Sequence, residues 1–226
     1  MNIALILASG SGTRMVGLDT PKQFCLVNDK PLFLYSVEAF EKNLSIDAIV
    51  IVTQTNFVNK VQSICDENAL FKVRLVTDGG NSRQESVYKG LKAIEDFAQD
   101  EDIILIHDAA RPLVSQAIID NNIKGCEEFG AVQTAIKTND TIVKADDEKS
   151  EVLDRSNLYQ VQTPQTFQYS IIKKAHQKAK REGIKNASDD AQLVGDVRIV
   201  NGESTNFKIT TIQDLKLLKA MLKKED

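Results

Sequence analysis

Short apolar runs alternate with amphipathic stretches along most of the first 136 residues, and this alternation limits the folds open to the chain. The runs have the character of buried strands and lie at Ile3–Leu7, Ala48–Thr53, Val73–Thr77, Ile103–His107 and about 130–136. Between them, apolar residues recur at helical spacing. This order predicts an α/β fold, a mostly parallel twisted sheet flanked by helices, with right-handed crossovers. Ligands of such sheets bind beyond the carboxyl ends of the strands, so the residues after each strand are the candidates for chemistry.

The alternation stops at about residue 137. Residues 137–155, KTNDTIVKADDEKSEVLDR, predict two short β segments around a polar turn, which together form a protruding β-arm. After the arm we predict a helix from about Tyr169 to Arg181, a short helix near Ala191, strands near Val197–Val200 and Phe207–Ile209, and a last helix with a capping box at Thr211 and Asp214. The chain shows no internal repeat and no linker, which predicts a single domain over residues 1–226.

Charge and composition exclude several classes of protein. The net charge is −4, whereas a general nucleic-acid binder normally has a basic excess. No apolar run approaches the roughly 18 residues of a membrane span, and the N-terminus carries no export signal. The three cysteines are widely spaced and odd in number, which is typical of reduced thiols in the cytoplasm. With only two histidines, a histidine-rich metal site is excluded. We therefore predict a cytoplasmic protein with no nucleic-acid or membrane partner.

The loop after the first strand, LASGSGTRM, has the composition of a phosphate-binding turn. Gly10 and Gly12 allow a tight turn that brings backbone N–H groups close to an anion. The loop is not a dinucleotide fingerprint, because Met15 occupies the third glycine position, and no Gly-Lys-Ser/Thr of a Walker A loop follows. Arg14 and Lys22 place two cations in this segment, which suggests a ligand with several phosphates.

Two further loops follow predicted strands. In DGGNSRQES, Gly80 allows close backbone approach and Ser86 lies in the first turn of the next helix, although a plain strand–helix turn explains the pattern equally well. In HDAARP, Asp108 falls at the edge of the sheet where a carboxylate meets Mg²⁺ or a ribose hydroxyl. Arg111 is compatible with an ion pair to Asp108 and with a ligand contact, and His107 is predicted to pack against the sheet.

Taken together, these segments resemble a known family. LASGSGTRM with PKQF, then GGNSRQESVYKGL, HDAARP, DR at 154–155, QTPQTF, SDDAQLV and NFKITT occur in this order over nearly the whole chain. The set resembles the 2-C-methyl-D-erythritol 4-phosphate cytidylyltransferases of non-mevalonate isoprenoid synthesis. The resemblance implies a Rossmann-like nucleotidyltransferase fold and transfer of a cytidylyl group from CTP to a polyol phosphate with Mg²⁺. It also implies a homodimer in which each β-arm, here about residues 137–155, clasps the partner.

The resemblance assigns roles to individual positions. The residues implied to bind the nucleotide are Ala8, Ser9, Gly10, Gly12, Gly80, Asn81, Ser86, Asp108 and Ala109. The residues implied to bind the polyol phosphate are Thr141 and Arg155, both from the partner subunit's arm, with Thr163, Ser188 and Lys208. The implied catalytic cations are Arg14, Lys22, Arg155 and Lys208, and Asp108 is the candidate metal ligand beside a metal held mainly by the triphosphate. The chain departs from the family's usual residues at Ser9, Asn81 and Ser188.

Two other functions are compatible with parts of the pattern. A relative that uses ribitol 5-phosphate for cell-wall polymer synthesis shares the first loop, QTPQ and the region of Lys208, whereas HDAARP and RQESVYKGL are closer to the methylerythritol enzymes. A catalytically silent nucleotide-sensing protein on the same fold is the more distant alternative. Such a protein would be free to lose some of Arg14, Lys22, Asp108, Arg155 and Lys208, and this sequence has all five.

Overall fold

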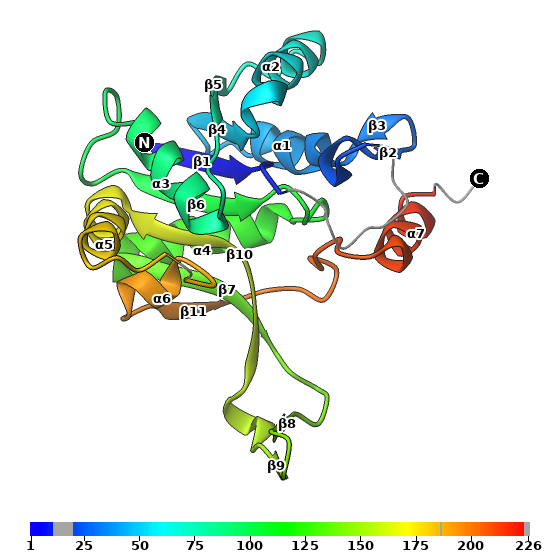
Figure 1. Cartoon of the computed structure of the whole chain (residues 1–226). Coiled ribbons are helices and arrows are strands. Elements are labelled where there is room, and N and C mark those ends of the chain that lie inside the picture. Colours follow the sequence, from blue (N-terminus) through cyan, green and yellow to red (C-terminus); the bar gives the residue numbers. More distant parts are fainter. Residues whose placement is uncertain (11–19, 186, 224–226) are drawn as a thin grey trace.

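A single large sheet organises the protein (Figure 1). The computed structural model describes residues 1–10, 20–185 and 187–223. Within these residues the seven strands of the sheet are, in order across it, β11 (Arg198–Asn201), β7 (Ala131–Lys137), β10 (Tyr159–Gln168), β6 (Ile103–Asp108), β1 (Asn2–Leu7), β4 (Ala48–Thr53) and β5 (Val73–Asp78). Every neighbouring pair is parallel except the two pairs that β10 makes, with β6 and β7. The predicted mostly parallel α/β sheet is confirmed.

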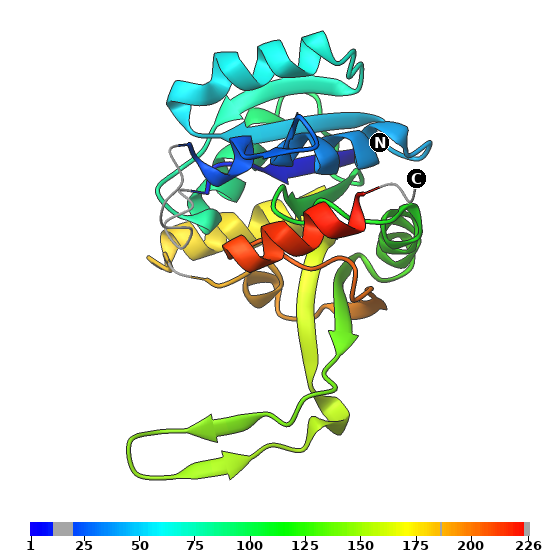
Figure 2. The ribbon, with the colours of Figure 1, turned by 90° about the vertical axis from the view of Figure 1, so that its right-hand side faces the viewer.

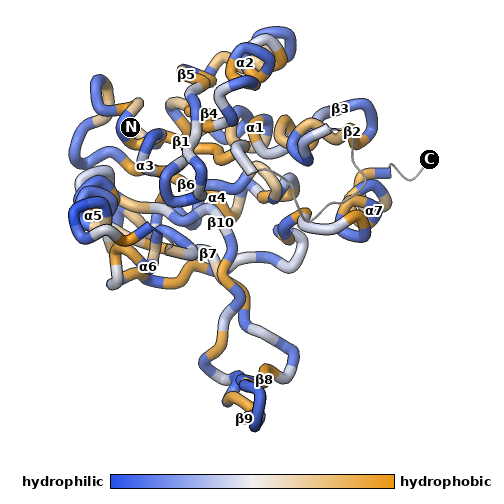
Figure 3. Tube along the Cα trace, in the orientation of Figure 1, coloured by the Kyte–Doolittle hydropathy of each residue, from blue (hydrophilic) through white to orange (hydrophobic). Residues whose placement is uncertain are grey.

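Helices cover both faces of this sheet. One face carries α1 (Leu32–Lys42), α2 (Val58–Glu67) and α4 (Gln116–Phe129), and the other carries α3 (Arg83–Ala93), α5 (Tyr169–Arg181) and α6 (Ala191–Val194). Successive side chains of a strand point to opposite faces, so β1 contributes Ala4 and Ile6 to the first core and Ile3 and Leu5 to the second. The outward side of α5 is mainly hydrophilic (Figure 3), as expected of a helix with one buried face.

The antiparallel strand β10 is a feature that the sequence analysis did not predict. Its sequence, YQVQTPQTFQ, is polar and contains a proline, yet its second half is buried. Two of the buried side chains bond inside the protein: Thr166 Oγ1 donates to Asn122 Oδ1 (3.0 Å), and Gln165 Oε1 accepts from the backbone N–H of Asp190 (3.0 Å). Gln165 Nε2 is buried and has no partner among the described residues. Burial of such groups is tolerated because these hydrogen bonds replace those with water. As a result, β10 runs alongside the end of β6 that carries Asp108.

A small third core is formed by residues from an N-terminal segment, 25–32, and a C-terminal segment, 209–218. Two short strands, β2 (Leu26–Val27) and β3 (Lys30–Pro31), pack near α7 (Ile212–Met221). The capping box predicted at Thr211 and Asp214 is present at the start of α7. The strand predicted at Phe207–Ile209 is wrong. This segment is irregular because it crosses the end of the sheet, where the backbone N–H of Ile209 bonds to Ala110 O (2.8 Å) outside any strand pairing.

The arm extends away from the body of the protein (Figures 1 and 2). Its two predicted β segments are confirmed as β8 (Val143–Ala145) and β9 (Ser150–Val152), which pair antiparallel. Short 3-10 turns lie at Lys22–Phe24, Thr55–Phe57 and, at the base of the arm, Arg155–Asn157. All residues of β8 and β9 are exposed, so no other described part of the chain covers these two strands.

Two smaller observations bear on the compositional predictions. Among the described residues, none of the helices combines the length and the apolar character that a membrane span needs. Cys25, Cys65 and Cys126 are buried and unpaired. Burial raises the pKa of the Cys65 and Cys126 thiols to about 12, so both are neutral thiols at physiological pH.

Candidate active site

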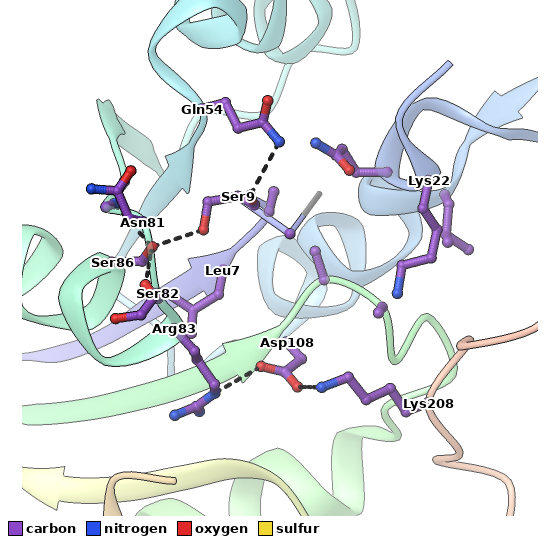
Figure 4. Close-up of a pocket in the computed structure, with 18 of the residues that line it drawn as sticks. Leu7, Ser9, Lys22, Gln54, Asn81, Ser82, Arg83, Ser86, Asp108 and Lys208 are labelled. Atoms are coloured by element: carbon purple, nitrogen blue, oxygen red, sulfur yellow. Dashed lines mark hydrogen bonds and ion pairs between the residues drawn. The ribbon is translucent and has the colours of Figure 1, made fainter. Parts of the chain in front are cut away.

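A cavity of about 800 Å³ opens at the carboxyl ends of β1 and β6 (Figure 4). This is the edge of the sheet at which the strand order predicted a ligand. Of the positions singled out from the sequence, those that line the cavity are Ala8, Ser9, Gly10, Lys22, Gly80, Asn81, Ser86, Asp108, Ala109 and Lys208. They come from five separate segments of the chain, which the fold brings together around one space.

The other predicted positions lie elsewhere. Gly12 and Arg14 fall outside the described residues. Thr163 is buried behind the cavity wall. Ser188 is exposed and its hydroxyl donates to Gln192 Oε1 (3.3 Å). Thr141 and Arg155 are exposed on the arm, where the Arg155 guanidinium donates to Asn139 O (2.7 Å). The structure of one chain therefore brings the described members of the predicted nucleotide group together, whereas Lys208 alone of the predicted polyol-phosphate group lines the cavity within the described residues.

Two serines close one wall of the cavity. Ser9 Oγ lies 2.9 Å from Ser86 Oγ, and the Ser86 oxygen also accepts from the backbone N–H of Gly80 (3.1 Å). Gly79 is packed beneath them, since a Cβ on Gly79 would lie 2.8 Å from Ser9 Cβ and 2.9 Å from Ser86 Oγ. A side chain at Gly79 would displace the serine pair, so glycine is needed here for close approach.

The helix that carries Ser86 begins at the cavity. Ser82 caps α3 by accepting a hydrogen bond from the backbone N–H of Glu85 (3.1 Å). The partial positive charge of a helix N-terminus favours anions and electron-rich groups nearby. The wall formed by β1 and α3 is therefore rich in hydroxyls and N–H donors.

The opposite wall is charged and centres on Asp108. Its Oδ2 atom lies 2.6 Å from Lys208 Nζ, and its Oδ1 atom lies 3.3 Å from Arg83 Nε (Figure 4). Burial by itself would raise the pKa of Asp108, but the two cations outweigh it and hold the pKa well below its usual range. Arg83 in turn pairs with the buried carboxylate of Asp190 (2.6 Å). Asp108 is therefore an ionised carboxylate held between two cations.

Arg83 is a cavity residue that the sequence analysis quoted without giving it a role. It follows β5 in the segment GGNSRQES, so its position after a strand was the available signal. Its Nη2 atom is buried and has no hydrogen-bond partner among the described residues. Asp190, which anchors Arg83, is more than 100 positions away in the chain, and only the tertiary structure reveals that contact.

Arg111 and His107 lie close to Asp108 in the chain and do not line the cavity. Among the described residues, Arg111 forms no ion pair with Asp108 or another acid. Its guanidinium donates to the backbone oxygens of Asn206 (2.7 Å) and Val161 (3.3 Å), and it does not line the cavity. His107 is fully buried against Phe40, as predicted, with ring centroids 5.1 Å apart. Burial lowers the pKa of His107 to about 4.

Lys22 lies on the cavity wall at the other side of the first loop. Its Nζ atom donates to Ile209 O (2.7 Å), which ties the turn at residues 22–24 to the segment that carries Lys208. The cavity thus has hydroxyl and N–H donors on one wall and lysines on the other. This arrangement suits a ligand with a polar ring at one end and several phosphates at the other.

The comparisons with known proteins agree with this geometry. A model of the 2-C-methyl-D-erythritol 4-phosphate cytidylyltransferase family matches residues 2–224. The chain belongs to this family. It is similar to the enzyme of that name from Clostridium acetobutylicum, with 41% identity over 99% of this chain and 98% of that protein. It is also similar to the ribitol-5-phosphate cytidylyltransferase of Streptococcus agalactiae, with 36% identity over 98% of this chain and 95% of that protein.

Solved structures of the family have the same fold. The 4-diphosphocytidyl-2C-methyl-D-erythritol synthase of Anaerococcus prevotii superposes with a TM-score of 0.84 at 25% identity, over 98% of this chain and 96% of that one. The cytidylyltransferase of Thermus thermophilus gives 0.78 at 30% identity, over 98% of both chains. The Rossmann-like fold is therefore confirmed, and the chain is a cytidylyltransferase, an enzyme of the nucleotidyltransferase class.

Proposed function

We propose that the protein transfers the cytidylyl group of CTP to 2-C-methyl-D-erythritol 4-phosphate, giving the CDP-linked polyol and pyrophosphate for isoprenoid precursor synthesis. The observation that carries this proposal is the cavity, which has donors for a base on one wall and Lys22, Lys208 and Arg83 near the other. Nucleotide contacts are proposed for Ala8, Ser9, Gly10, Gly12, Gly80, Asn81, Ser86, Asp108 and Ala109.

The reaction needs charge neutralisation more than proton transfer. A phosphate oxygen of the polyol phosphate attacks the α-phosphorus of CTP in line, a new P–O bond forms, and the bond to the bridging oxygen of pyrophosphate breaks. A phosphate monoester is largely a dianion at pH 7, since its second pKa is about 6, so no general base is required. The difficulty is that this anion must approach the negatively charged triphosphate, and positioned cations offset the electrostatic repulsion between the two. We assign this task to Arg14 and Lys22 at the triphosphate, and to Lys208 and the partner's Arg155 at the attacking phosphate.

Mg²⁺ is the cofactor that this chemistry implies. Asp108 is the only carboxylate that lines the cavity within the described residues, where no cluster of three metal-ligating side chains occurs. This donor set fits Mg²⁺, which is commonly bound by one or two carboxylates together with substrate phosphates. When bound, the metal would neutralise part of the triphosphate charge. Asp108 would hold it, since each of its carboxylate oxygens has a second lone pair beyond the one that faces Arg83 or Lys208.

The second substrate requires groups beyond those in the cavity. We propose that the partner's Thr141 and the partner's Arg155 bind the polyol phosphate, together with Ser188 and Lys208. Arg155 and Thr141 are exposed on the arm, and the strands β8 and β9 between them are exposed along their whole length. A two-fold dimer would place each arm over the other subunit reciprocally. The resemblance gives Thr163 a place in this group too, but its contacts favour a different role, which is argued below.

Ribitol 5-phosphate is the alternative second substrate. Ribitol-5-phosphate cytidylyltransferases match this chain at 36–37% identity, close to the 38–41% of four methylerythritol enzymes from clostridia. The deciding experiment measures pyrophosphate release with Mg²⁺-CTP and each polyol phosphate separately. A higher kcat/KM for ribitol 5-phosphate would transfer the assignment to that substrate. Absence of turnover with both, despite measurable CTP binding, would identify a nucleotide-sensing protein.

The nucleotide is tested in the same assay. CTP and UTP differ at one edge of the ring, where UTP replaces an N–H donor by a carbonyl acceptor. A mismatch leaves buried polar groups unpaired at about 1–3 kcal/mol each. We expect kcat/KM for CTP to exceed that for UTP by at least about tenfold. Equal values would contradict a cytosine-reading site.

A further inference from the structure

Behind the cavity wall, three hydrogen bonds in series run from the backbone of Asp108 through Thr163 of β10 and the His107 ring to the backbone oxygen of Arg111. The backbone N–H of Asp108 donates to Thr163 Oγ1 (3.1 Å). Thr163 Oγ1 lies 3.1 Å from His107 Nδ1, and His107 Nε2 lies 3.1 Å from Arg111 O. Asp108, Thr163 and His107 are all buried, so water does not compete for these bonds.

The direction of the bonds follows from the donors and acceptors. A backbone carbonyl only accepts, so His107 Nε2 must carry the hydrogen that bonds to Arg111 O. In the neutral ring Nδ1 is then an acceptor, and the Thr163 hydroxyl must donate to it. The Thr163 oxygen accepts from Asp108 N–H at the same time. Every group in the series has one defined role, and reversing any bond would leave two donors or two acceptors facing each other.

We infer that Thr163 and His107 are positioning residues for the cytidylyl transfer, which hold the backbone at Asp108 and thereby orient its carboxylate between Arg83 and Lys208. The inference rests on the proposed function. It gives Thr163 a role besides the polyol-phosphate contact that the resemblance implies, because its single hydroxyl hydrogen is used inside the protein. Thr163 also does not line the cavity.

The fold explains why the hydroxyl comes from β10. The pairing of β10 with β7 is interrupted between Val161 and Gln165, and Thr163 lies in this interruption. On its other side β10 pairs with β6, where Gln165 is opposite Ile106. Thr163 thus falls beside the end of β6, next to the residue that bears the carboxylate. Misplacement of a reacting group by about 1 Å can cost around a hundredfold in rate, so a buried anchor at this point has a catalytic effect.

The test compares two substitutions at Thr163, one that replaces the hydroxyl group and one that removes the methyl group. Thr163→Val keeps the shape and removes the hydroxyl, whereas Thr163→Ser keeps the hydroxyl. We expect kcat in Thr163→Val to fall about tenfold or more, with the KM values for CTP and for the polyol phosphate changing much less. Thr163→Ser should recover most of the loss. A rise confined to KM for the polyol phosphate, with kcat unchanged, would instead show direct substrate contact and overturn the inference.

A spectroscopic measurement tests the hydrogen bonds without any turnover. The chain has two histidines, so ¹⁵N-labelled imidazole spectra contain two sets of ring signals, and His176→Gln identifies its own set by loss. At pH 7 the His107 ring should have hydrogen on Nε2 alone. In Thr163→Val its Nδ1 signal should shift as that nitrogen loses its donor, and in Thr163→Ser it should return. Hydrogen on Nδ1 in the wild-type protein would refute this series of hydrogen bonds. That result would hold even if Thr163→Val does not fold, and even if the proposed substrates prove wrong.

Discussion

The cavity and the arm are built in opposite ways. Around the cavity the polar side chains bond to one another within a single chain, as in the pairs Ser9–Ser86 and Asp108–Lys208. On the arm, Val143 and Val152 are 49% and 66% exposed, and a ladder of three residue pairs joins β8 to β9. Isolated two-stranded hairpins are marginal in water. The difference indicates that the nucleotide side of the site is organised within one chain, whereas the role proposed for the arm depends on a second copy.

The largest effect is expected on the cavity side. Arg14→Ala should lower kcat by at least about a hundredfold, because loss of one preorganised donor to a transition state costs roughly 3–4 kcal/mol. CTP affinity should change much less, since other groups still bind the phosphates. Arg14→Lys, which keeps the charge, is the matched control and should retain more activity. An unchanged kcat with only a raised KM for CTP would mean that Arg14 contributes to ground-state binding alone.

The equivalent substitution on the arm should affect the other substrate. Arg155→Ala should raise KM for the polyol phosphate about tenfold or more, as expected for a charge-assisted phosphate contact of about 1.5–3 kcal/mol. KM for CTP should be unchanged, and steady-state kinetics with each substrate varied in turn would show this.

Mixing the two variants tests whether the arm acts in trans. Subunits with Arg155→Ala and subunits with Arg14→Ala should regain activity together, because a mixed dimer contains one site with both arginines. Sedimentation must first show that subunits exchange. A fully active monomer, or no recovery after verified exchange, would exclude a site shared between subunits.

A packing change at the cavity wall should lower the stability of the protein, whereas a substitution at an exposed position of the arm should not. Gly79→Ala introduces a Cβ that clashes with Ser9 and Ser86, and overpacking of this kind typically costs about 1–3 kcal/mol. For a chain of this size each kcal/mol lowers Tm by about 2–4 °C. Gly10→Ala is the control, because a Cβ there meets no atom of the described residues within 4 Å. A Tm equal to that of wild type would show that the cavity wall adapts freely.

The smallest change in stability is expected on the arm itself. Val152→Ser should alter the free energy of unfolding of dilute protein by no more than about 0.5 kcal/mol, as for most exposed positions. It should nevertheless weaken dimerisation, measured by sedimentation over a range of concentrations. Leu44→Ser is the control, since Leu44 is 98% exposed on the body and is not proposed to contact a partner. If the wild type, Val152→Ser and Leu44→Ser dimerise with equal affinity, the arm is not part of the dimer interface.

Several elements were predictable because their signals are local. The buried strands β1, β4 and β6 are largely continuous apolar runs, and the capping box of α7 lies within four residues. In a parallel sheet the ends of such strands meet at one edge, so a cavity beside Asp108 followed from the order of the elements. The resemblance of the quoted segments to one family, confirmed by the family comparison, supplied the chemistry that the spacing alone left open.

Other features depend on contacts between distant parts of the chain. Strand β10 escaped prediction because its polar residues are buried only where Asn122 and Asp190 satisfy them. From the sequence, Arg111 was compatible with an ion pair to Asp108 and with a ligand contact. In the structure its guanidinium donates to two backbone oxygens from distant segments. The segment at Phe207–Ile209 has an apolar pattern suited to a strand, yet it finds no strand beside it with which to form a ladder.

The sequence by itself determined the alternation of strands and helices, the edge of the sheet that carries the cavity, and the residue types available there. These follow from periodicity and from short-range chemistry, which each segment carries on its own. Only the tertiary structure decided that Asp108 is held between Arg83 and Lys208 and is anchored from behind by Thr163. Those contacts join residues 25 to 100 positions apart. Their partners are chosen by which strands and loops pack side by side, and no local pattern in the chain encodes that choice.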